Sequence, residues 1–246
     1  MSRLSSRTHH RRPLRLAVLS DVHANLEALE AVLHEVEARG ADEIICLGDV
    51  VGYGPDPEAC VERIRALSAV TVLGNHDEAV ARGEGIEYLP KHGQRAARLH
   101  QSWLSADALA WLDGLPLTAV HGGVTLAHAA PLDPEEWPRL DSFRLIREQF
   151  GAFDTDVCFV GHSHRPAVVS DKIGVMRVRP GARFIIDVGS VGQPRDKDPR
   201  ASFGLFDTEA TAFELVRVGY DVARTARRVK ERGLPAELGD RLAHGL

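Results

Sequence analysis

Residues 16–23 read Leu-Ala-Val-Leu-Ser-Asp-Val-His, and this stretch decides the fold class of the 246-residue chain. Its first four residues form a short apolar run that is typical of a buried strand, and the run ends at polar residues. Asn25 then suits a helix N-cap, and apolar residues follow at helical spacing until Gly40, which suits the position after a helix C-terminus. The stretch therefore predicts a strand, a polar turn and a helix in direct succession.

This succession continues along the chain. Residues 44–47 predict a second buried strand that ends at Gly48-Asp49, and a helix is expected over 57–67. Residues 70–73 predict a third strand that ends at Gly74-Asn75. Apolar strands that alternate with helices form parallel sheets with right-handed crossovers, so the chain is expected to be of the α/β class.

Beyond this unit the chain divides at Ala167. Before it, the patterns predict a mainly helical insertion over 78–115 and a hairpin over 117–127. A helical segment with a loose start is expected over 134–150, and a buried strand over 157–160. After it, apolar and polar residues alternate, which predicts strands over 167–170, 175–178, 183–188, 203–207 and 212–218, with a closing helix over 220–232. Two groups of strands with helices outside each predict two mixed sheets packed face to face.

Composition excludes several classes of protein. The 30 Lys and Arg residues against 35 Asp and Glu residues give a net charge of −5, which argues against stable nucleic-acid binding through a basic field. The apolar runs are too short to span a bilayer. Residues 1–13 are expected to form a disordered basic tail without the apolar core of a secretory signal, and residues 14–246 a single domain. Cys46, Cys60 and Cys158 show no metal-binding spacing and cannot all pair, which fits a cytoplasmic location.

Polar side chains follow the ends of five buried strands. These residues are Asp21 and His23, Asp49, Asn75 with His76 and Asp77, His128, and His162 and His164. In open α/β sheets ligands bind beyond the carboxyl ends of the strands, because the loops there converge. The spacing from Asp21 to Asp49 and on to Asn75 is about one strand and crossover, so these residues are expected to lie side by side.

Each of these residues taken alone has an ordinary structural interpretation. A single Asp after a strand usually caps a helix, and a single His is usually a satisfied, half-buried side chain. Clustered carboxylates without cations are costly, however, and a metal ion removes that cost. The mixture of Asp, Asn and His favours Mn, Fe, Ni, Co or Zn over Ca or Mg. Seven ligands exceed the needs of one ion, so we expect two divalent transition-metal ions, manganese first, about 3.5–4 Å apart.

The motifs D-x-H, G-D, G-N-H-D, a lone His and G-H-x-H, in this order, resemble those of the calcineurin-like metallophosphoesterase family. The resemblance runs from about Leu16 to Phe206 and implies a four-layer α-β-β-α sandwich. Residues 52–57, 189–195 and Tyr220-Asp221 are similar to the small bacterial and archaeal phosphodiesterases of the family. The chain departs from the family at Asp187-Val188, where Asn-Pro is usual, and after His128, where Gly-Ser is usual.

The resemblance also implies roles for the polar residues. The first metal would be held by Asp21, His23, Asp49 and His164, and the second by Asp49, Asn75, His128 and His162. His76 would face the substrate and protonate the leaving group, while Asp77 would orient the His76 imidazole and keep it cationic.

These roles predict a phosphoester hydrolase in which a hydroxide shared by the two metals attacks phosphorus in line with the leaving oxygen. Related phosphatases carry an arginine after the G-D motif, where this chain has Gly52-Tyr53-Gly54, and its loss favours diesters over the more highly charged monoesters. Arg165 or Arg195 could partly replace that arginine. A phosphomonoesterase, a dinucleoside-polyphosphate hydrolase and a non-catalytic scaffold stay open as alternatives. The expected partner is a small phosphoester or nucleotide, and self-association to a homo-oligomer is left open.

Overall fold

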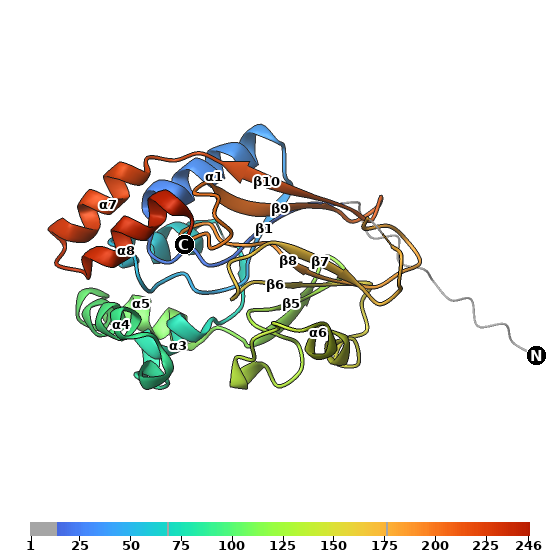
Figure 1. Cartoon of the computed structure of the whole chain (residues 1–246), viewed down its shortest axis with the longest axis horizontal. Helices are drawn as coiled ribbons and strands as arrows, with labels where there is room; N and C mark the ends of the chain where they lie inside the picture. The colour runs from blue at the N-terminus through green and yellow to red at the C-terminus, as the bar shows by residue number, and fades with distance from the viewer. Residues whose placement is uncertain (1–13, 68, 176) are drawn as a thin grey trace, which may run out of the picture.

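The computed structural model describes residues 14–67, 69–175 and 177–246, which form two five-stranded mixed sheets (Figure 1). The first sheet has the strand order β10 (Ala212–Val218), β9 (Ala201–Asp207), β1 (Arg15–Leu19), β2 (Glu43–Cys46) and β3 (Val70–Thr71). The second sheet has the order β4 (Thr118–His121), β5 (Val124–Ala127), β6 (Val157–Val160), β8 (Phe184–Asp187) and β7 (Ala167–Ser170). The predicted tail over 1–13 lies outside the described residues.

The pairing of the strands confirms the parallel unit and corrects the grouping. β1, β2 and β3 are parallel neighbours, and β4 and β5 form the predicted hairpin. The alternating strands after Ala167 do not form a group of their own. β9 joins the first sheet antiparallel to β1, and β10 pairs antiparallel with β9, whereas β7 and β8 complete the second sheet. Because position in the sequence does not determine the edge that a strand joins, the pattern alone could not divide these strands.

The strand expected over 175–178 is wrong. β7 and β8 pair directly as antiparallel neighbours, with Ser170 opposite Phe184, so the described residues between them belong to the connecting loop. Gly174 and Gly181 both have left-handed backbone conformations in this loop. Such conformations belong to turns rather than to strands, and the described residues of 175–178 lie outside any strand.

Helices occupy the positions that the periodicity indicated, and two short ones follow the predicted closing helix without having been predicted. They are α1 (Leu26–Ala38), α2 (Pro57–Ala66), α3 (Asn75–Arg82), α4 (Lys91–Trp103), α5 (Ala106–Asp113), α6 (Phe143–Gln149), α7 (Val222–Glu231) and α8 (Ala236–Asp240). Short 3-10 helices are η1 (Ile86–Tyr88), η2 (Pro134–Glu136) and η3 (Arg241–His244). The two that follow the predicted closing helix are α8 and η3. In the described part of the chain, every helix falls short of the length and apolar character that crossing a bilayer requires.

Alternation along the central strands builds four layers. In β1, Leu16 and Val18 belong to the core between the two sheets together with Phe159 of β6, whereas Ala17 and Leu19 face the helical layer that includes α1. In β6, the intervening Cys158 and Val160 pack with residues of and beside α6 on the far side. Figure 1 shows α1 and α6 on opposite outer faces of the pair of sheets. The expected α-β-β-α sandwich is therefore confirmed.

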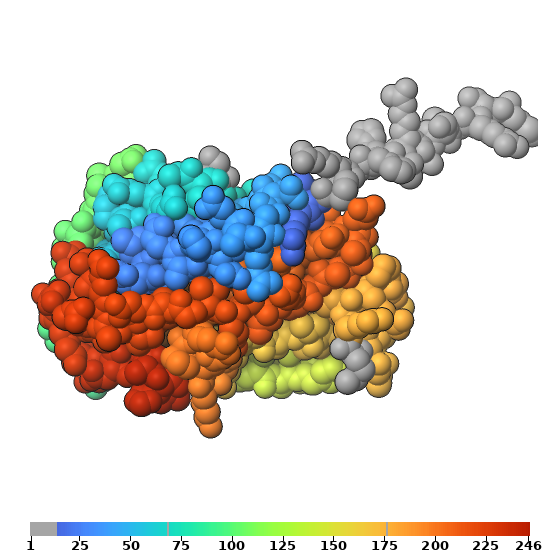
Figure 2. Space-filling view, turned by 90° about the horizontal axis from the view of Figure 1, so that it is seen from above, coloured from blue at the N-terminus to red at the C-terminus, as the bar shows by residue number. Residues whose placement is uncertain are grey.

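Helix α7 packs beside the loop that follows β1 and the start of α1. Figure 2 shows α1, near the start of the chain, lying alongside the C-terminal segment that contains α7. The Thr225 hydroxyl of α7 donates to Asn25 Oδ1 over 3.0 Å, and Arg224 pairs with Glu27 at 2.9 Å. Asn25 also caps α1 by accepting from the Ala28 N–H group, as predicted. The C-terminal helix thus supports the loop that carries Asp21 and His23.

Candidate metal centre

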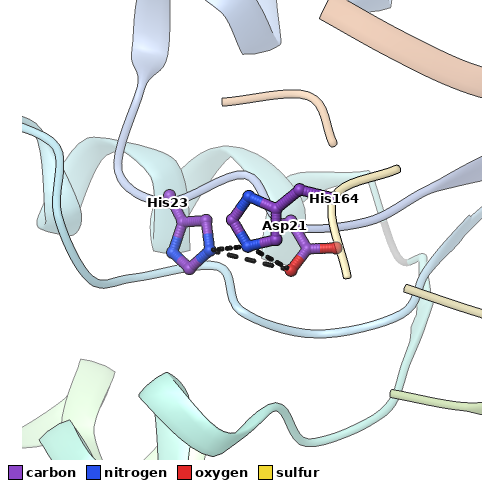
Figure 3. Close-up of side chains that lie close together, drawn as sticks. All are labelled: Asp21, His23 and His164. Atoms are coloured by element: carbon purple, nitrogen blue, oxygen red, sulfur yellow. Dashed lines mark hydrogen bonds and ion pairs between the residues drawn. The ribbon is translucent and has the colours of Figure 1, made fainter. Parts of the chain in front are cut away.

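The carboxyl ends of strands from both sheets bring the predicted ligands together. Asp21 and His23 follow β1, and the Oδ1 atom of Asp21 lies 3.2 Å from His164 Nε2 and 3.6 Å from His23 Nε2. The two imidazole Nε2 atoms are themselves 3.1 Å apart (Figure 3). All three side chains are at most 2% exposed. Ligands about 2.1 Å from one ion lie about 3 Å from each other, which is the spacing of this group.

Asp49 connects this group to the remaining predicted ligands. Its Oδ2 atom lies 3.5 Å from His23 Nε2 and 3.3 Å from His128 Nε2. Its Oδ1 atom accepts a hydrogen bond from the backbone N–H group of His76 over 2.8 Å. One carboxylate oxygen therefore lies between imidazoles of the two expected ligand sets, where a bridging ligand would have to be.

His162 and Asn75 complete the cluster at its open side. His162 Nδ1 and Asn75 Oδ1 face each other at 3.0 Å, and the backbone N–H group of His162 donates to Asp21 Oδ2 over 3.1 Å. Burial and the neighbouring His128 lower the pKa of His162 to about 4. The structure therefore gathers all seven predicted ligands at one edge of the sandwich.

The orientation of three imidazoles tests whether a cation fits. The Nδ1 atoms of His23, His128 and His164 lie 3.0, 2.8 and 2.6 Å from the carbonyl oxygens of Val51, Leu47 and Gln193. Because a carbonyl oxygen only accepts, each Nδ1 carries a proton, and in the neutral form of each ring the Nε2 lone pair faces the centre. Neutral rings held in this way leave two lone pairs facing each other between His23 and His164. A cation between them removes this repulsion.

Charge and unmet hydrogen-bonding capacity support the same conclusion. Among the described residues, the buried atoms Asp21 Oδ1 and His128 Nε2 have no hydrogen-bond partner. Burial by itself would raise the pKa of Asp21 and Asp49, but the surrounding imidazoles hold the pKa of both carboxyl groups below the usual range. Burial would likewise lower the pKa of His128, but the adjacent Asp49 raises it to about 10. The cluster thus needs positive charge, and its donor set fits divalent metal ions.

The backbone holds the ligands in conformations that most residues avoid. Asp21, His23, Asp49, His162 and His164 have φ angles of 53°, 48°, 52°, 65° and 59°. Left-handed conformations are uncommon outside glycine and concentrate at functional sites, where the surrounding structure has to enforce them. Five of the seven predicted ligands share this feature, which no sequence pattern indicated.

Two motif glycines make room for the carboxylates. A Cβ atom at Gly74 would lie 2.2 Å from Asp49 Oδ1, and one at Gly161 would lie 2.6 Å from Asp21 Oδ2. Both distances are far below van der Waals contact. The glycines of the G-N-H-D and G-H-x-H motifs are therefore required for neighbouring strand ends to approach the carboxylates of Asp49 and Asp21.

The structure corrects the expected relation between His76 and Asp77. The Asp77 carboxylate accepts from the Val51 and Gly74 N–H groups, at 3.1 and 3.2 Å, and so caps α3. Within the described residues, no hydrogen bond joins Asp77 to His76, and His76 Nδ1 has no partner. Burial also lowers the pKa of His76 well below its usual range, which favours the neutral imidazole. Asp77 therefore positions the start of α3 rather than the His76 ring.

His76 instead packs against Tyr53, for which the sequence predicted no role in the site. The Tyr53 ring centroid lies 4.3 Å from that of His76 and 4.7 Å from that of His23. The loop that carries Tyr53 is held by the buried His100 of α4, which accepts from the Gly52 N–H group at 3.1 Å and lies 2.9 Å from the Gly54 carbonyl oxygen. The helical insertion thus supports the site, and the high number of histidines was the one signal that could have pointed to His100.

A cleft of about 280 Å³ opens over the cluster. His76, Tyr53, Asn75 and several ligands line it, together with two arginines, Arg139 and Arg195. The Arg195 guanidinium lies 5.5 Å from the Tyr53 ring centroid. Cations from other loops therefore line this cleft, although no arginine follows the G-D motif. Arg165, the other candidate, lines an adjoining cavity instead.

The departure at Asp187 does not disturb its loop. The Asp187 carboxylate accepts from the Gly189 N–H group at 2.8 Å and from the Ser163 hydroxyl at 2.6 Å. The loop after β8 is thereby tied to the loop that carries His162 and His164.

Comparison with known proteins agrees with the geometry. Residues 14–211 match the family model of the calcineurin-like phosphoesterase superfamily domain. The chain is 39% identical over 240 residues to the uncharacterized protein MJ0912 of Methanocaldococcus jannaschii, covering 94% of this chain and 98% of that one. It is 26% identical over 206 residues to the phosphodiesterase YfcE of Escherichia coli, covering 80% of this chain and 89% of that one.

A solved structure shows the same architecture. The metallophosphoesterase from Sphaerobacter thermophilus superposes with a TM-score of 0.84 at 38% sequence identity, covering 96% of this chain and all of that one. The family match spans the strands and loops that carry every predicted ligand. The chain therefore belongs to the calcineurin-like phosphoesterase superfamily and is a hydrolase of this class.

Proposed function

We propose that the protein is a phosphodiesterase that depends on two divalent transition-metal ions, manganese first. Asp21, His23, Asp49 and His164 would hold one ion, and Asp49, Asn75, His128 and His162 the other. The observation that carries this proposal is the position of Asp49 Oδ2 between imidazoles of both sets. When bound, the ions lower the pKa of water and neutralise the charge that develops on the phosphoryl oxygens.

The reaction is the addition of water to phosphorus with cleavage of the opposite P–O bond. The water oxygen bonds to phosphorus, the leaving alkoxide departs with the bonding electron pair and takes up a proton, and a phosphomonoester and an alcohol result. The neutral His76 imidazole at the cleft wall is placed to donate a hydrogen bond to the leaving oxygen. Such assistance contributes roughly 100- to 10,000-fold to hydrolysis rates.

The arginines of the cleft set the expected charge of the substrate. Arg139 is exposed, and its guanidinium has no protein partner in the described part of the chain, whereas Arg195 donates to Gln193 Oε1 at 2.8 and 3.3 Å. One free guanidinium at the rim suits the single negative charge of a diester better than the nearly double charge of a monoester. The name of the Escherichia coli relative, a phosphodiesterase, agrees with this preference.

The test is a metal analysis of the untreated protein followed by a substrate panel at saturating manganese. We expect about two equivalents of transition metal and faster hydrolysis of bis(p-nitrophenyl) phosphate than of p-nitrophenyl phosphate. Equal or faster turnover of the monoester would overturn the diester preference, and turnover confined to dinucleoside polyphosphates would assign the protein to that alternative. A refolded protein that binds neither manganese nor iron would overturn the proposal altogether.

A further inference from the structure

A second cavity of about 300 Å³ adjoins the metal cleft. The two spaces share three lining residues, Arg139, His162 and Arg195, so a ligand that crosses this wall would reach both. The volume is at the lower end of the range for small-molecule pockets, about 300–1,000 Å³. It suits one organic group rather than a second complete nucleotide.

The lining of this second cavity indicates the chemistry of its ligand. Leu140, Ile146, Val169 and Ile185 give it apolar walls. Asp187 and Ser163 hydrogen-bond to each other and to the backbone, so they require no hydrogen bond from a ligand, and the other carboxylate of the lining, Asp141, is exposed to solvent. Arg165 lies exposed at the edge and uses only its Nε atom, which donates to the Arg195 carbonyl at 2.9 Å. Apolar walls with a guanidinium at the rim suit a planar aromatic group, because guanidinium faces stack on such rings.

The position of His76 decides which part of a diester enters this cavity. His76 lines the metal cleft but not the second cavity. If the leaving oxygen faces His76, the other ester group points across Arg139 and His162. We propose that the second cavity binds the ester group that stays on phosphorus, and that this group is a planar aromatic such as the base of a nucleotide.

This inference rests on the proposed phosphodiesterase function and names its substrate class. The experiment uses two diesters with the same charge and the same p-nitrophenolate leaving group, thymidine 5′-(p-nitrophenyl) phosphate and methyl p-nitrophenyl phosphate. With the manganese-loaded wild-type protein we expect kcat/KM to be at least about tenfold higher for the thymidine ester. Hydrolysis of both esters at equal kcat/KM would overturn the inference and leave the phosphodiesterase proposal intact, whereas hydrolysis of neither would overturn both.

Two neighbouring residues of the edge strand β7 provide a matched pair of variants. Ala167 is exposed and lines the second cavity, whereas Val168, 46% exposed, points to the other face of the strand. Ala167→Trp, and more mildly Ala167→Leu, should lower the ratio of the two kcat/KM values, by about tenfold for tryptophan. Val168→Trp should leave the ratio at its wild-type value. A ratio unchanged by Ala167→Trp, or lowered equally by Val168→Trp, would overturn the inference.

Calorimetry of product binding gives a readout that does not depend on turnover. Thymidine 5′-monophosphate carries the retained group, and methyl phosphate lacks it. We expect the manganese-loaded protein to bind thymidine 5′-monophosphate at least tenfold more tightly than methyl phosphate, and Ala167→Trp to abolish most of this difference. Equal affinity of the wild-type protein for both phosphates would contradict the inference.

Discussion

The cluster of candidate metal ligands and the second cavity lie side by side but are built in different ways. In the cluster, the ligand side chains are held by backbone carbonyls, by neighbouring carboxylates and by left-handed turns. The second cavity is lined by ordinary strand and loop side chains, and Arg139 and Arg165 are exposed at its edge. The backbone therefore holds the cluster in place, whereas the second cavity depends on side chains of strands and loops, which we propose to select the substrate.

The largest effect should follow from breaking the cluster at Asp49. Asp49→Asn removes the negative charge between His23 and His128, and metal ions contribute several kcal/mol of charge stabilisation in such sites, so kcat/KM should fall by ~1,000-fold or more. The bound metal, measured by mass spectrometry, should fall with it. A variant that keeps both its metal content and its activity would show that Asp49 does not bridge.

A smaller loss should follow from His76→Asn, which removes the hydrogen-bond donor at the cleft wall. The fall in kcat should be about 100-fold or more for an alkyl leaving group, and less for p-nitrophenolate, which departs without a proton. Metal content should not change. Equal losses for both leaving groups would show that His76 does not act on the leaving oxygen.

Asp77→Asn is the matched control, one residue along α3. Because Asp77 caps the helix and does not contact His76, the variant should lose about 1 kcal/mol of folding stability, as helix-cap variants do. Its kcat should stay within a few-fold of the wild type, as measured beside thermal unfolding. A loss of kcat as large as that of His76→Asn would restore the orienting role for Asp77.

The smallest effect should come from the wall that the two regions share. Arg139→Gln removes an exposed guanidinium that has no partner in the described part of the chain, so it should raise KM for diesters by about 3- to 10-fold with little change in kcat. The effect should shrink at high salt, because exposed charges are screened. Arg144→Gln on α6, 76% exposed and outside both spaces, is the control and should leave KM unchanged. A fall in kcat at constant KM would assign Arg139 to the chemical step instead.

Much of the cluster could be predicted from sequence because it depends on short-range pattern. An apolar run predicts each buried strand, and the carboxyl ends of parallel strands meet at one edge of a sheet. That rule placed Asp21, Asp49 and Asn75 together from their spacing alone. It also brought His128 and His162 to the same edge, although they lie in the second sheet.

The predictions that were wrong or missing concern contacts between residues that are distant in the sequence. The partner of Asp77 is decided by where the N–H groups of Val51 and Gly74 lie, and neither is visible in the motif. The support that His100 gives to the Gly52–Gly54 loop joins residues some forty-eight positions apart. Periodicity describes which face of an element is buried, but it does not say what covers that face.

The sequence by itself determined the α/β class, the buried strands and the identity of the clustered polar residues, because periodicity and strand-end rules are local. Only the tertiary structure decided which sheet each later strand joins, how the imidazoles are turned and that a second cavity shares a wall with the metal cleft. These features depend on contacts between side chains from the two sheets, and such contacts cannot be inferred from the local order of residues along the chain.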